Sequence, residues 1–337
     1  MKVILSFDYE LFFGTNSGSP EKCMIEPANA LASIAAEYRV PLCFFVDTGY
    51  LVAMKRFGVA NRVLRKHEAI IRHNLDDLSS QRHEILLHVH PHWEDAVWTS
   101  DRWHFDLSRF CLNNFNSAEV MDIVKRNVDE LRQHTKDGRI HAYRAGGWAV
   151  QPFPAIGRAL KAAGINIDST VFPGGINATG ITNFDFVVTP NKPHWFFDKD
   201  PATEDLLGSF LEVPTSSMSV SPSYYWRTAL ARLTARADMK SFGDGMVRSV
   251  STRKSGLDKL SKLFSSTLYC VTLDGMKAGL AVSEYRRALK KGSEMLVLLS
   301  HPKMITPFSL QCLRQLLKEI SSNGDEVIGY EYFDSTV

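Results

Sequence analysis

This 337-residue sequence has few cysteines, almost no net charge and no long hydrophobic run. Its five cysteines are widely scattered and never form a CxxC pair, which indicates a reducing compartment and argues against a disulfide framework or a cysteine zinc site. A formal net charge of +2 gives no reason to expect nucleic acid as a partner. No apolar stretch reaches the roughly 18 residues of a transmembrane helix.

Signals for secretion and for nucleotide binding are also missing. The first apolar run ends at Asp8 and Glu10, which makes it too short for a signal peptide, so we expect a cytoplasmic protein. The glycine pairs at 146–147 and 174–175 fit neither the GxGxxG pattern nor a Walker pattern. The sequence therefore does not favour a dinucleotide-binding or P-loop fold.

Short apolar segments alternate with helical patterns along most of the chain. The apolar segments predict strands at about 2–7, 42–46, 84–88, 140–143, 165–168, 184–188, 210–213, 268–273, 294–299 and 326–329. The helical patterns fall at about 26–38, 50–57, 60–80, 117–134, 153–163, 275–290 and 306–321. This alternation predicts a parallel sheet built from right-handed βαβ units, and the number of strands favours a barrel over an open sheet.

One region, at about 218–266, differs from the rest in composition. We interpret it as a basic, mostly helical insertion in a single domain that spans residues 1–337. Its charge indicates a solvated helical face, an anion-facing cover for a phosphate-bearing or acidic substrate, or a contact with a membrane surface. Its basic residues are Arg227, Arg232, Arg236, Lys240, Arg248, Arg253, Lys254, Lys259 and Lys262.

Three histidines cluster in the segment HVHPHW, directly after an apolar run. Neutral imidazole is the commonest metal ligand among side chains, so the cluster predicts a metal site at the end of a strand. If the backbone turns helically there, His88 and His92 share a face, and His90 points elsewhere. A fully extended chain would bring all three to one side. A polar loop with surface histidines is the alternative.

Three further motifs end predicted strands. In SFDYE, Asp8 and Glu10 are two residues apart and so point to the same side of an extended chain. They could act as metal ligand or general base, or form a cap or a salt bridge. YRAGGW brings Arg144 next to two glycines, and LLSHP ends an apolar strand at His301. The carboxyl ends of barrel strands form the mouth where active sites lie.

Together these motifs resemble the polysaccharide deacetylases of the NodB-homology type, carbohydrate esterase family four. The resemblance runs from Val3 to about Pro302. It implies a deformed, incomplete (β/α) barrel of about seven parallel strands. It also implies a hydrolase that uses one divalent metal ion to remove an N-acyl group, by expectation acetyl, from an amino sugar. Zinc suits mixed nitrogen and oxygen ligands best, and cobalt, nickel or manganese could substitute.

The resemblance also implies roles for individual residues. In the family pattern, His88 and His92 are metal ligands and Asp8 is the general base. Arg144 takes the position of the residue that orients this base, and His301 that of the general acid.

The sequence departs from the family pattern at three positions. Tyr9 replaces the second aspartate of the usual pair, which makes Glu10 the replacement metal ligand. Gly146 stands where a proline is usual. Asp168 and Glu212, which both follow predicted strands, compete for the place of the aspartate that tunes the acid histidine.

Four residues near these motifs are candidates for contact with the substrate, namely Trp93, Trp148, His90 and Gly147. We expect a carbohydrate substrate, and a soluble nucleotide- or lipid-linked precursor would fit a cytoplasmic enzyme. A deformylase or a glycoside hydrolase on a related barrel, or a non-catalytic carbohydrate-binding protein, are the alternatives. A glycoside hydrolase would need two carboxylates across the scissile bond and no metal.

Overall fold

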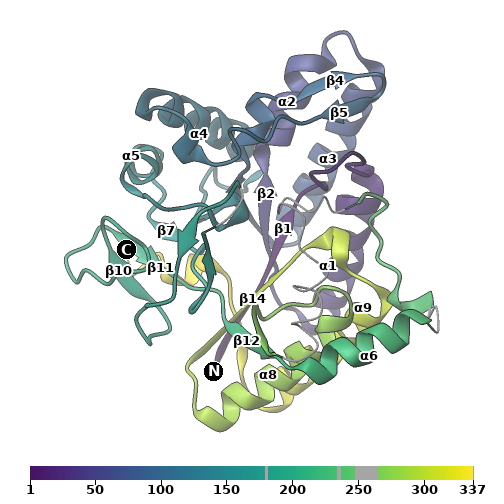
Figure 1. The fold of residues 1–337 in the computed structure, drawn as a ribbon, viewed down its shortest axis with the longest axis vertical. Helices are drawn as coiled ribbons and strands as arrows, with labels where there is room; N and C mark the ends of the chain where they lie inside the picture. The colour runs from purple at the N-terminus through teal and green to yellow at the C-terminus, as the bar shows by residue number, and fades with distance from the viewer. Residues whose placement is uncertain (179–180, 234–236, 247–264, 337) are drawn as a thin grey trace.

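The computed structural model of the chain describes residues 1–178, 181–233, 237–246 and 265–336 (Figure 1). Its main sheet contains β1 (Lys2–Tyr9), β2 (Cys43–Asp47), β3 (Glu84–Val89), β6 (Ala142–Ala145), β7 (Ile167–Asp168), β10 (Trp195–Phe197), β11 (Phe210–Glu212), β14 (Met295–Ser300) and β15 (Glu326–Val327). The strand order is β10-β11-β7-β6-β3-β2-β1-β14, and β15 pairs with the start of β1.

The seven strands from β11 to β14 in this order are parallel, and only β10 at the edge is antiparallel. The sheet curls but does not close, since no ladder joins β11 to β14 within the described residues. The chain after β11 spans the gap, where Ser216 N donates to Val297 O at 2.9 Å and Val271 N donates to Ser216 O at 2.7 Å. The prediction of a deformed, incomplete barrel is confirmed.

Helices lie around the outside of the curled sheet (Figure 1). They are α1 (Glu26–Tyr38), α2 (Thr48–Gly58), α3 (Arg62–Ser80), α4 (Ser117–Leu131), α5 (Pro154–Ala162), α6 (Pro222–Leu233), α8 (Ala278–Lys291) and α9 (Pro307–Ser322). Polar side chains start several of them. Asn61 Oδ1 accepts hydrogen bonds from Val63 N and Leu64 N at the start of α3, and a capping box of Asn116 and Glu119 begins α4.

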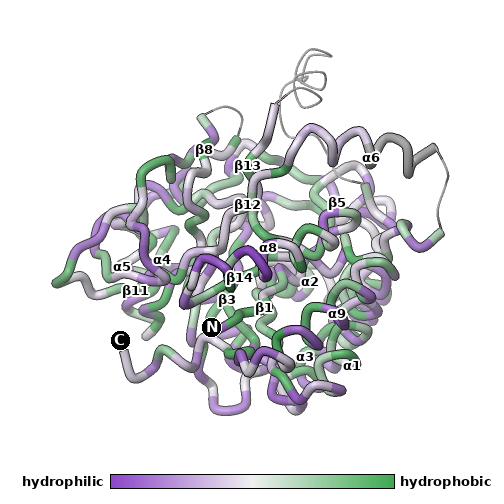
Figure 2. Tube along the Cα trace, turned by 90° about the horizontal axis from the view of Figure 1, so that it is seen from below, coloured by the Kyte–Doolittle hydropathy of each residue, from purple (hydrophilic) through white to green (hydrophobic). Residues whose placement is uncertain are grey.

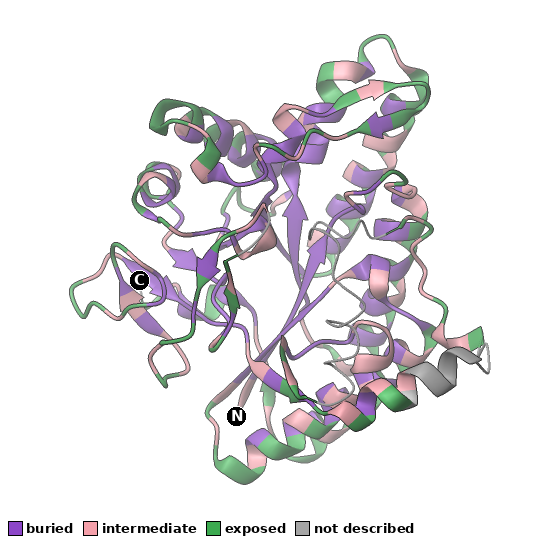
Figure 3. Cartoon of the chain, viewed as in Figure 1, coloured by how far each residue is buried: buried purple, intermediate pink, exposed green. Residues whose placement is uncertain are grey.

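The central strands are buried on both faces, as expected of a parallel sheet covered by helices. In β1, every residue from Val3 to Tyr9 is buried. Tyr9 points away from the barrel mouth and donates from its hydroxyl to Asn74 Oδ1 of α3 at 2.8 Å. Hydrophobic residues concentrate along these strands (Figure 2), and the helices expose their outer faces (Figure 3).

Two predicted strands form hairpins outside the barrel sheet, and one observed strand was not predicted. The segment predicted at 184–188 contributes only β9 (Phe184–Asp185), which pairs with β8 (Ile176–Asn177) outside the barrel. The segment at 268–273 forms β13 (Thr267–Cys270), paired with β12 (Ser217–Val220). The antiparallel strand β10 was not predicted. Apolar runs this short do not reveal whether their partner is the barrel or a local hairpin.

Only part of the basic insertion lies within the described residues. Its described elements are β12, α6 and the short helix Ala237–Met239. Arg236 and the five basic residues from Arg248 to Lys262 lie outside the described residues, and the division into one domain with an insertion stays a prediction. Among the described residues, no helix has the length and apolarity needed to cross a membrane.

Candidate active site

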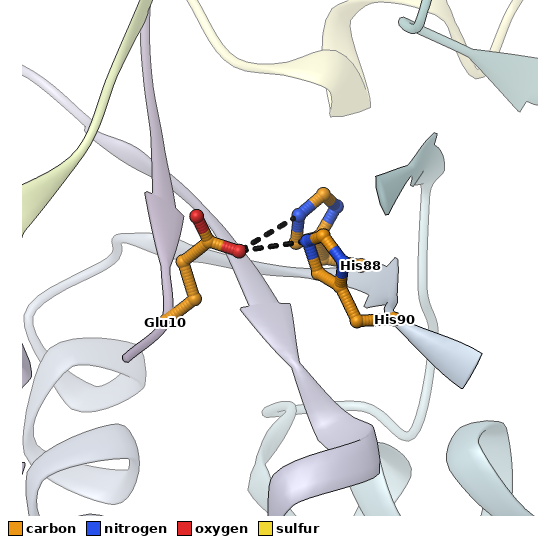
Figure 4. A group of neighbouring side chains, drawn as sticks. All are labelled: Glu10, His88 and His90. Carbon is orange, nitrogen blue, oxygen red and sulfur yellow. Dashed lines mark ion pairs between the residues drawn. The ribbon is translucent and has the colours of Figure 1, made fainter. Parts of the chain in front are cut away.

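Glu10, His88 and His90 converge on one point at the ends of β1 and β3 (Figure 4). His90 Nε2 lies 2.8 Å and His88 Nε2 lies 3.4 Å from the same oxygen, Glu10 Oε2. All three side chains are buried. Glu10 Oε2 has no hydrogen-bond partner of suitable angle among the described residues. Two nitrogens and one carboxylate oxygen that face a common point could hold a metal ion.

The ring of His88 is oriented by the backbone of β6. Its Nδ1 lies 2.9 Å from the carbonyl oxygen of Arg144, which can only accept a hydrogen bond, so Nδ1 carries the proton and Nε2 faces Glu10. Burial lowers the pKa of His88, but the charges of Asp8 and Glu10 raise it more, to about 9. A metal ion at this point would therefore replace a proton on His88.

The neighbouring imidazole, His90, is neutral. Burial lowers its pKa to about 4, against the opposing charge of Glu10. His90 is extended, with φ −109° and ψ 96°, so it continues the alternation of β3 and faces the same side as His88. The ring packs directly against Gly146. A side chain at this position would clash with the ring, because an added Cβ would lie 2.5 Å from His90 Nδ1. The second motif glycine, Gly147, has φ +61°.

The structure does not bring His92 into this group, although the four-residue spacing predicts it as a ligand together with His88. Pro91 begins a 3₁₀-helix (Pro91–Glu94) immediately after the extended His90, and this turn carries His92 away from Glu10. Its ring stacks on Phe110 at 5.4 Å and meets Phe13 edge-on at 4.6 Å. Neither ring nitrogen has a hydrogen-bond partner among the described residues. His90, two positions after His88, instead lies next to Glu10 and His88.

Asp8 lies beside this group and is held by Arg144. Arg144 Nη1 donates to Asp8 Oδ1 at 2.6 Å. Asp8 Oδ2 faces the pocket, 3.9 Å from His88 Nε2 and 3.8 Å from His301 Nε2. The rest of the guanidinium is fixed, since Nε donates to Ser169 O at 2.8 Å and Nη2 to Ser6 Oγ at 2.9 Å. These hydrogen bonds fix the guanidinium, which in turn orients the carboxylate of Asp8.

His301 follows β14 and is clamped by Asp274, a residue that the sequence prediction missed. Asp274 Oδ1 accepts from His301 N at 2.8 Å, and Asp274 Oδ2 lies 2.8 Å from His301 Nδ1. Burial lowers the pKa of His301, but the charge and hydrogen bond of Asp274 raise it above its usual value. His301 Nε2 faces Asp8 and Glu10, 3.8 Å from the nearest oxygen of each. This arrangement fits a proton donor.

Lys303 is the second residue that the sequence prediction missed. It lies in the short helix Pro302–Met304, and its Nζ donates to Glu10 Oε1 at 2.8 Å and to Leu11 O at 2.6 Å. Burial favours the protonated form of Glu10, but Lys303 and the histidines lower the pKa of Glu10 well below its usual value. Lys303 thus occupies one oxygen of Glu10 and leaves the other facing the histidines.

Asp168 and Glu212, the two residues expected to compete for contact with His301, lie elsewhere. They are register partners on β7 and β11 and are fully buried. Burial raises the pKa of Asp168 to about 7 and that of Glu212 well above its usual value. Asp168 Oδ1 accepts from Thr170 Oγ1 and Glu212 Oε1 from Val171 N, so both carboxyls order the loop after β7.

A pocket of about 360 Å³ opens above these groups. Of the four candidate substrate contacts, His90, Gly147 and Trp148 line the pocket. Trp93 is not among the lining residues, because its side chain is 1 % exposed and packs on Tyr50. Its Nε1 donates to Asp47 Oδ2 at 2.6 Å. The remaining lining residues of the pocket are Asp8, Glu10, Phe12, Phe13, His88, Phe110, Arg144, Ala145, Asp274, His301, Lys303 and Met304.

No protein-family model matches the sequence, and neither does any curated protein sequence. Solved structures do resemble the fold. A proposed polysaccharide deacetylase from Mycobacterium smegmatis matches with a TM-score of 0.54 and 16 % identity, over 100 % of this chain and 89 % of its own.

Two GH57 branching enzymes also match. The enzyme from Pyrococcus horikoshii has a TM-score of 0.53 and 9 % identity, and that from Thermococcus kodakaraensis has 0.51 and 12 %. Each match covers 99 % of this chain and 70 % of the enzyme. At these identities the likeness shows a shared fold.

Proposed function

We propose that this chain is a metal-dependent hydrolase that removes an N-acyl group from an amino sugar. The observation that carries the proposal is the arrangement around one pocket of three units. These are the Glu10–His88–His90 group, the Asp8–Arg144 pair and the His301–Asp274 pair. Amide hydrolysis needs an activated water, a base to take its proton and an acid to protonate the leaving amine. The three units fit these needs in that order.

The metal would be held by Glu10, His88 and His90. Their two imidazole nitrogens and one carboxylate oxygen suit zinc, and cobalt, nickel or manganese could substitute. A divalent ion held by these residues would lower the pKa of a water ligand to about 7 and would polarise a carbonyl oxygen. This ligand set replaces the one expected from sequence, with His90 in the place of His92.

Asp8 is the proposed general base. Arg144 Nη1 donates to Oδ1 at 2.6 Å and holds the carboxylate in place, which leaves Oδ2 facing the pocket. In the reaction, the oxygen of water bonds to the acyl carbon and Asp8 takes the proton that is lost. The C–N bond then breaks, and the products are a carboxylic acid and a free amine.

His301 is the proposed general acid. Asp274 accepts from Nδ1 at 2.8 Å and so directs the second proton, on Nε2, toward the pocket. Because an amide does not release an unprotonated amine readily, this proton goes to the departing nitrogen. Asp274 also favours the protonated imidazole before the reaction, by raising the pKa of His301.

The same arrangement argues against glycoside hydrolysis, despite the likeness to GH57 enzymes. A glycosidase needs one protonated carboxyl group as acid and a second carboxylate opposite. Each of the three carboxylates that line the pocket contacts a cation, namely Arg144, Lys303 or His301. Such contacts favour the charged form of a carboxyl group over the protonated one.

The direct test incubates the metal-loaded protein with N-acetyl and N-formyl amino sugars, both free and nucleotide-linked. We expect release of acetate or formate with an equal amount of amine, and loss of this activity in Asp8→Asn. The metal content is measured on the same sample. Activity in a metal-free protein, or release of reducing ends from oligosaccharides without loss of acyl groups, would contradict the proposal.

A further inference from the structure

The lining of the active-site pocket has a charged part and an apolar part. The charged part consists of the groups described above. The apolar part is mainly Phe12, Phe13, Phe110, Trp148 and Met304. Trp148 contributes its ring alone, because its Nε1 atom is itself buried.

Each carboxylate of the pocket binds a cation through one oxygen, and the polar atoms that still face the pocket are those of the proposed reaction centre. Asp8 binds Arg144, Glu10 binds Lys303, and Asp274 binds His301. A sugar ring carries several hydroxyl groups, and each loses stability when it is buried without a hydrogen-bond partner. The apolar part of the pocket offers none, so it does not suit a hydroxyl-rich ring.

The apolar part lies beside the metal-ligand group. The rings of Phe13 and Phe110 lie 4.4 Å and 5.4 Å from the ring of His90, which faces Oε2 of Glu10. His301, the proposed donor to the amine, instead faces Oε1 of Glu10 at 3.8 Å. If an amide binds between them with its nitrogen next to His301, its acyl substituent extends toward the side of His90, where Phe110 and Phe13 lie. Phe13 also contacts Lys303, with 4.9 Å between Nζ and the ring.

From this geometry we infer that the pocket takes an apolar N-acyl group larger than acetyl. The inference rests on the proposed function, since it names the acyl group that the same site removes. The cavity of about 360 Å³ is at the small end of ligand pockets. It therefore suits one acyl chain at the reacting carbonyl, with most of the sugar nearer to solvent.

The test is a series of N-acyl glucosamines with acetyl, butanoyl and hexanoyl groups, because every member releases the same amine. Each buried methylene contributes a factor of about four to affinity for the transition state. We expect kcat/KM to rise about tenfold or more from acetyl to butanoyl. Equal rates, or acetyl as the best substrate, would overturn the inference and leave the proposed function intact. Release from no member would overturn both.

A binding experiment separates the pocket from turnover. We expect the zinc-loaded protein to bind hexanohydroxamate at least about tenfold more tightly than acetohydroxamate, with the difference reduced in Phe13→Ala. Met304→Ala, at a half-buried lining position, is the second variant if Phe13→Ala does not fold. Tyr332→Ala is the matched control, because Tyr332 is 49 % exposed and does not line the pocket. Equal affinities for the two hydroxamates would contradict the inference. So would a difference in affinity that both lining variants leave unchanged.

Discussion

Two sets of buried or partly buried carboxyl groups lie at or just beyond the ends of strands, and they differ in their neighbours. The paired carboxyls each contact a cation and line the pocket. They are Asp8, Glu10 and Asp274. The unpaired carboxyls make no ion pair with a described residue and lie outside the pocket lining. They are Asp47, Asp168 and Glu212.

The comparison shows that position at a strand end does not determine the charge of a carboxyl group. Burial raises the pKa of Asp47 to about 8 and that of Asp168 to about 7. In Asp274, whose side chain is only partly buried, the effect of burial is outweighed by the charge of His301, so its pKa is lowered. A nearby cation thus favours the charged form of a carboxyl group, whereas burial without a cation favours the protonated form.

Neutralising a paired carboxyl should have the largest effect. We expect Asp8→Asn to lower kcat about 100- to 10,000-fold, because an amide cannot take the proton of the attacking water. The rate of amine release measures this effect. Asp168→Asn is the matched control and should change kcat less than about threefold, since it does not line the pocket. Equal losses in the two variants would remove the functional distinction between the sets.

The two sets should also differ in metal binding. We expect Glu10→Gln to weaken zinc binding by at least about 100-fold, because loss of a direct ligand should exceed the 10- to 100-fold cost of losing an outer-shell contact. Glu212→Gln should bind zinc as the unchanged protein does. Competition with a chromophoric chelator measures both affinities.

A second matched pair tests the choice between two histidines. His90→Phe should lose the ion, whereas His92→Phe should keep it, because His92 lies among the aromatic rings of Phe13 and Phe110. The reverse result would restore the ligand pair expected from the four-residue spacing.

Much of this architecture could be predicted from the sequence. Continuous apolar runs specify parallel strands buried on both faces, and alternation with helices specifies their connection. The two-residue spacing of Asp8 and Glu10 put both on one side of β1, because strand geometry is regular. The short hairpins were less predictable, since they depend on tertiary partners.

The rest of the site depended on local backbone geometry and on distant contacts. Whether His90 or His92 joins His88 is decided at Pro91, where an extended chain changes to a 3₁₀-helix. Asp274 directly follows a predicted strand, so its position could have marked it as a candidate site residue. Its contact with His301, however, joins segments 27 residues apart, and the sequence does not specify that contact. Lys303 reaches Glu10 across 293 positions, a contact that no local pattern specifies.

The unpaired carboxyls should make the free energy of unfolding fall as the pH rises. The folded-state pKa of Asp168, about 7, lies above its unfolded value near 4. Its stabilising contribution is therefore complete below about pH 4 and is lost as the pH rises toward 7, at about 1.4 kcal/mol per pH unit. We expect Asp168→Asn to remove this part of the pH dependence of the free energy of unfolding, which urea unfolding at several pH values measures. An unchanged slope would mean that Asp168 is charged.

For the paired carboxyls, we expect the free energy of unfolding to change with pH in the opposite direction. The pKa of Asp274 is lowered in the folded state, so its stabilising contribution is present above its unfolded value near 4 and is lost as the pH falls below it. Asp274→Asn should therefore reduce the loss of stability in acid. It should also remove the part of the stability that is lost as the pH rises above the unfolded pKa of histidine, near 6.5, because Asp274 raises the pKa of His301. Urea unfolding between pH 2 and 8 measures both variants in one series.

The smallest effect is expected when Glu10 loses its contact with Lys303 and keeps its contacts with the two histidines. Lys303→Met removes the ammonium that donates to Glu10 Oε1 at 2.8 Å and that would repel a divalent ion bound at Oε2. We expect zinc affinity to rise about tenfold, a modest gain for the loss of one nearby like charge. Lys303→Arg keeps the charge and should change the affinity little. A fall in affinity in Lys303→Met would instead mean that Lys303 acts mainly by holding Glu10 in position.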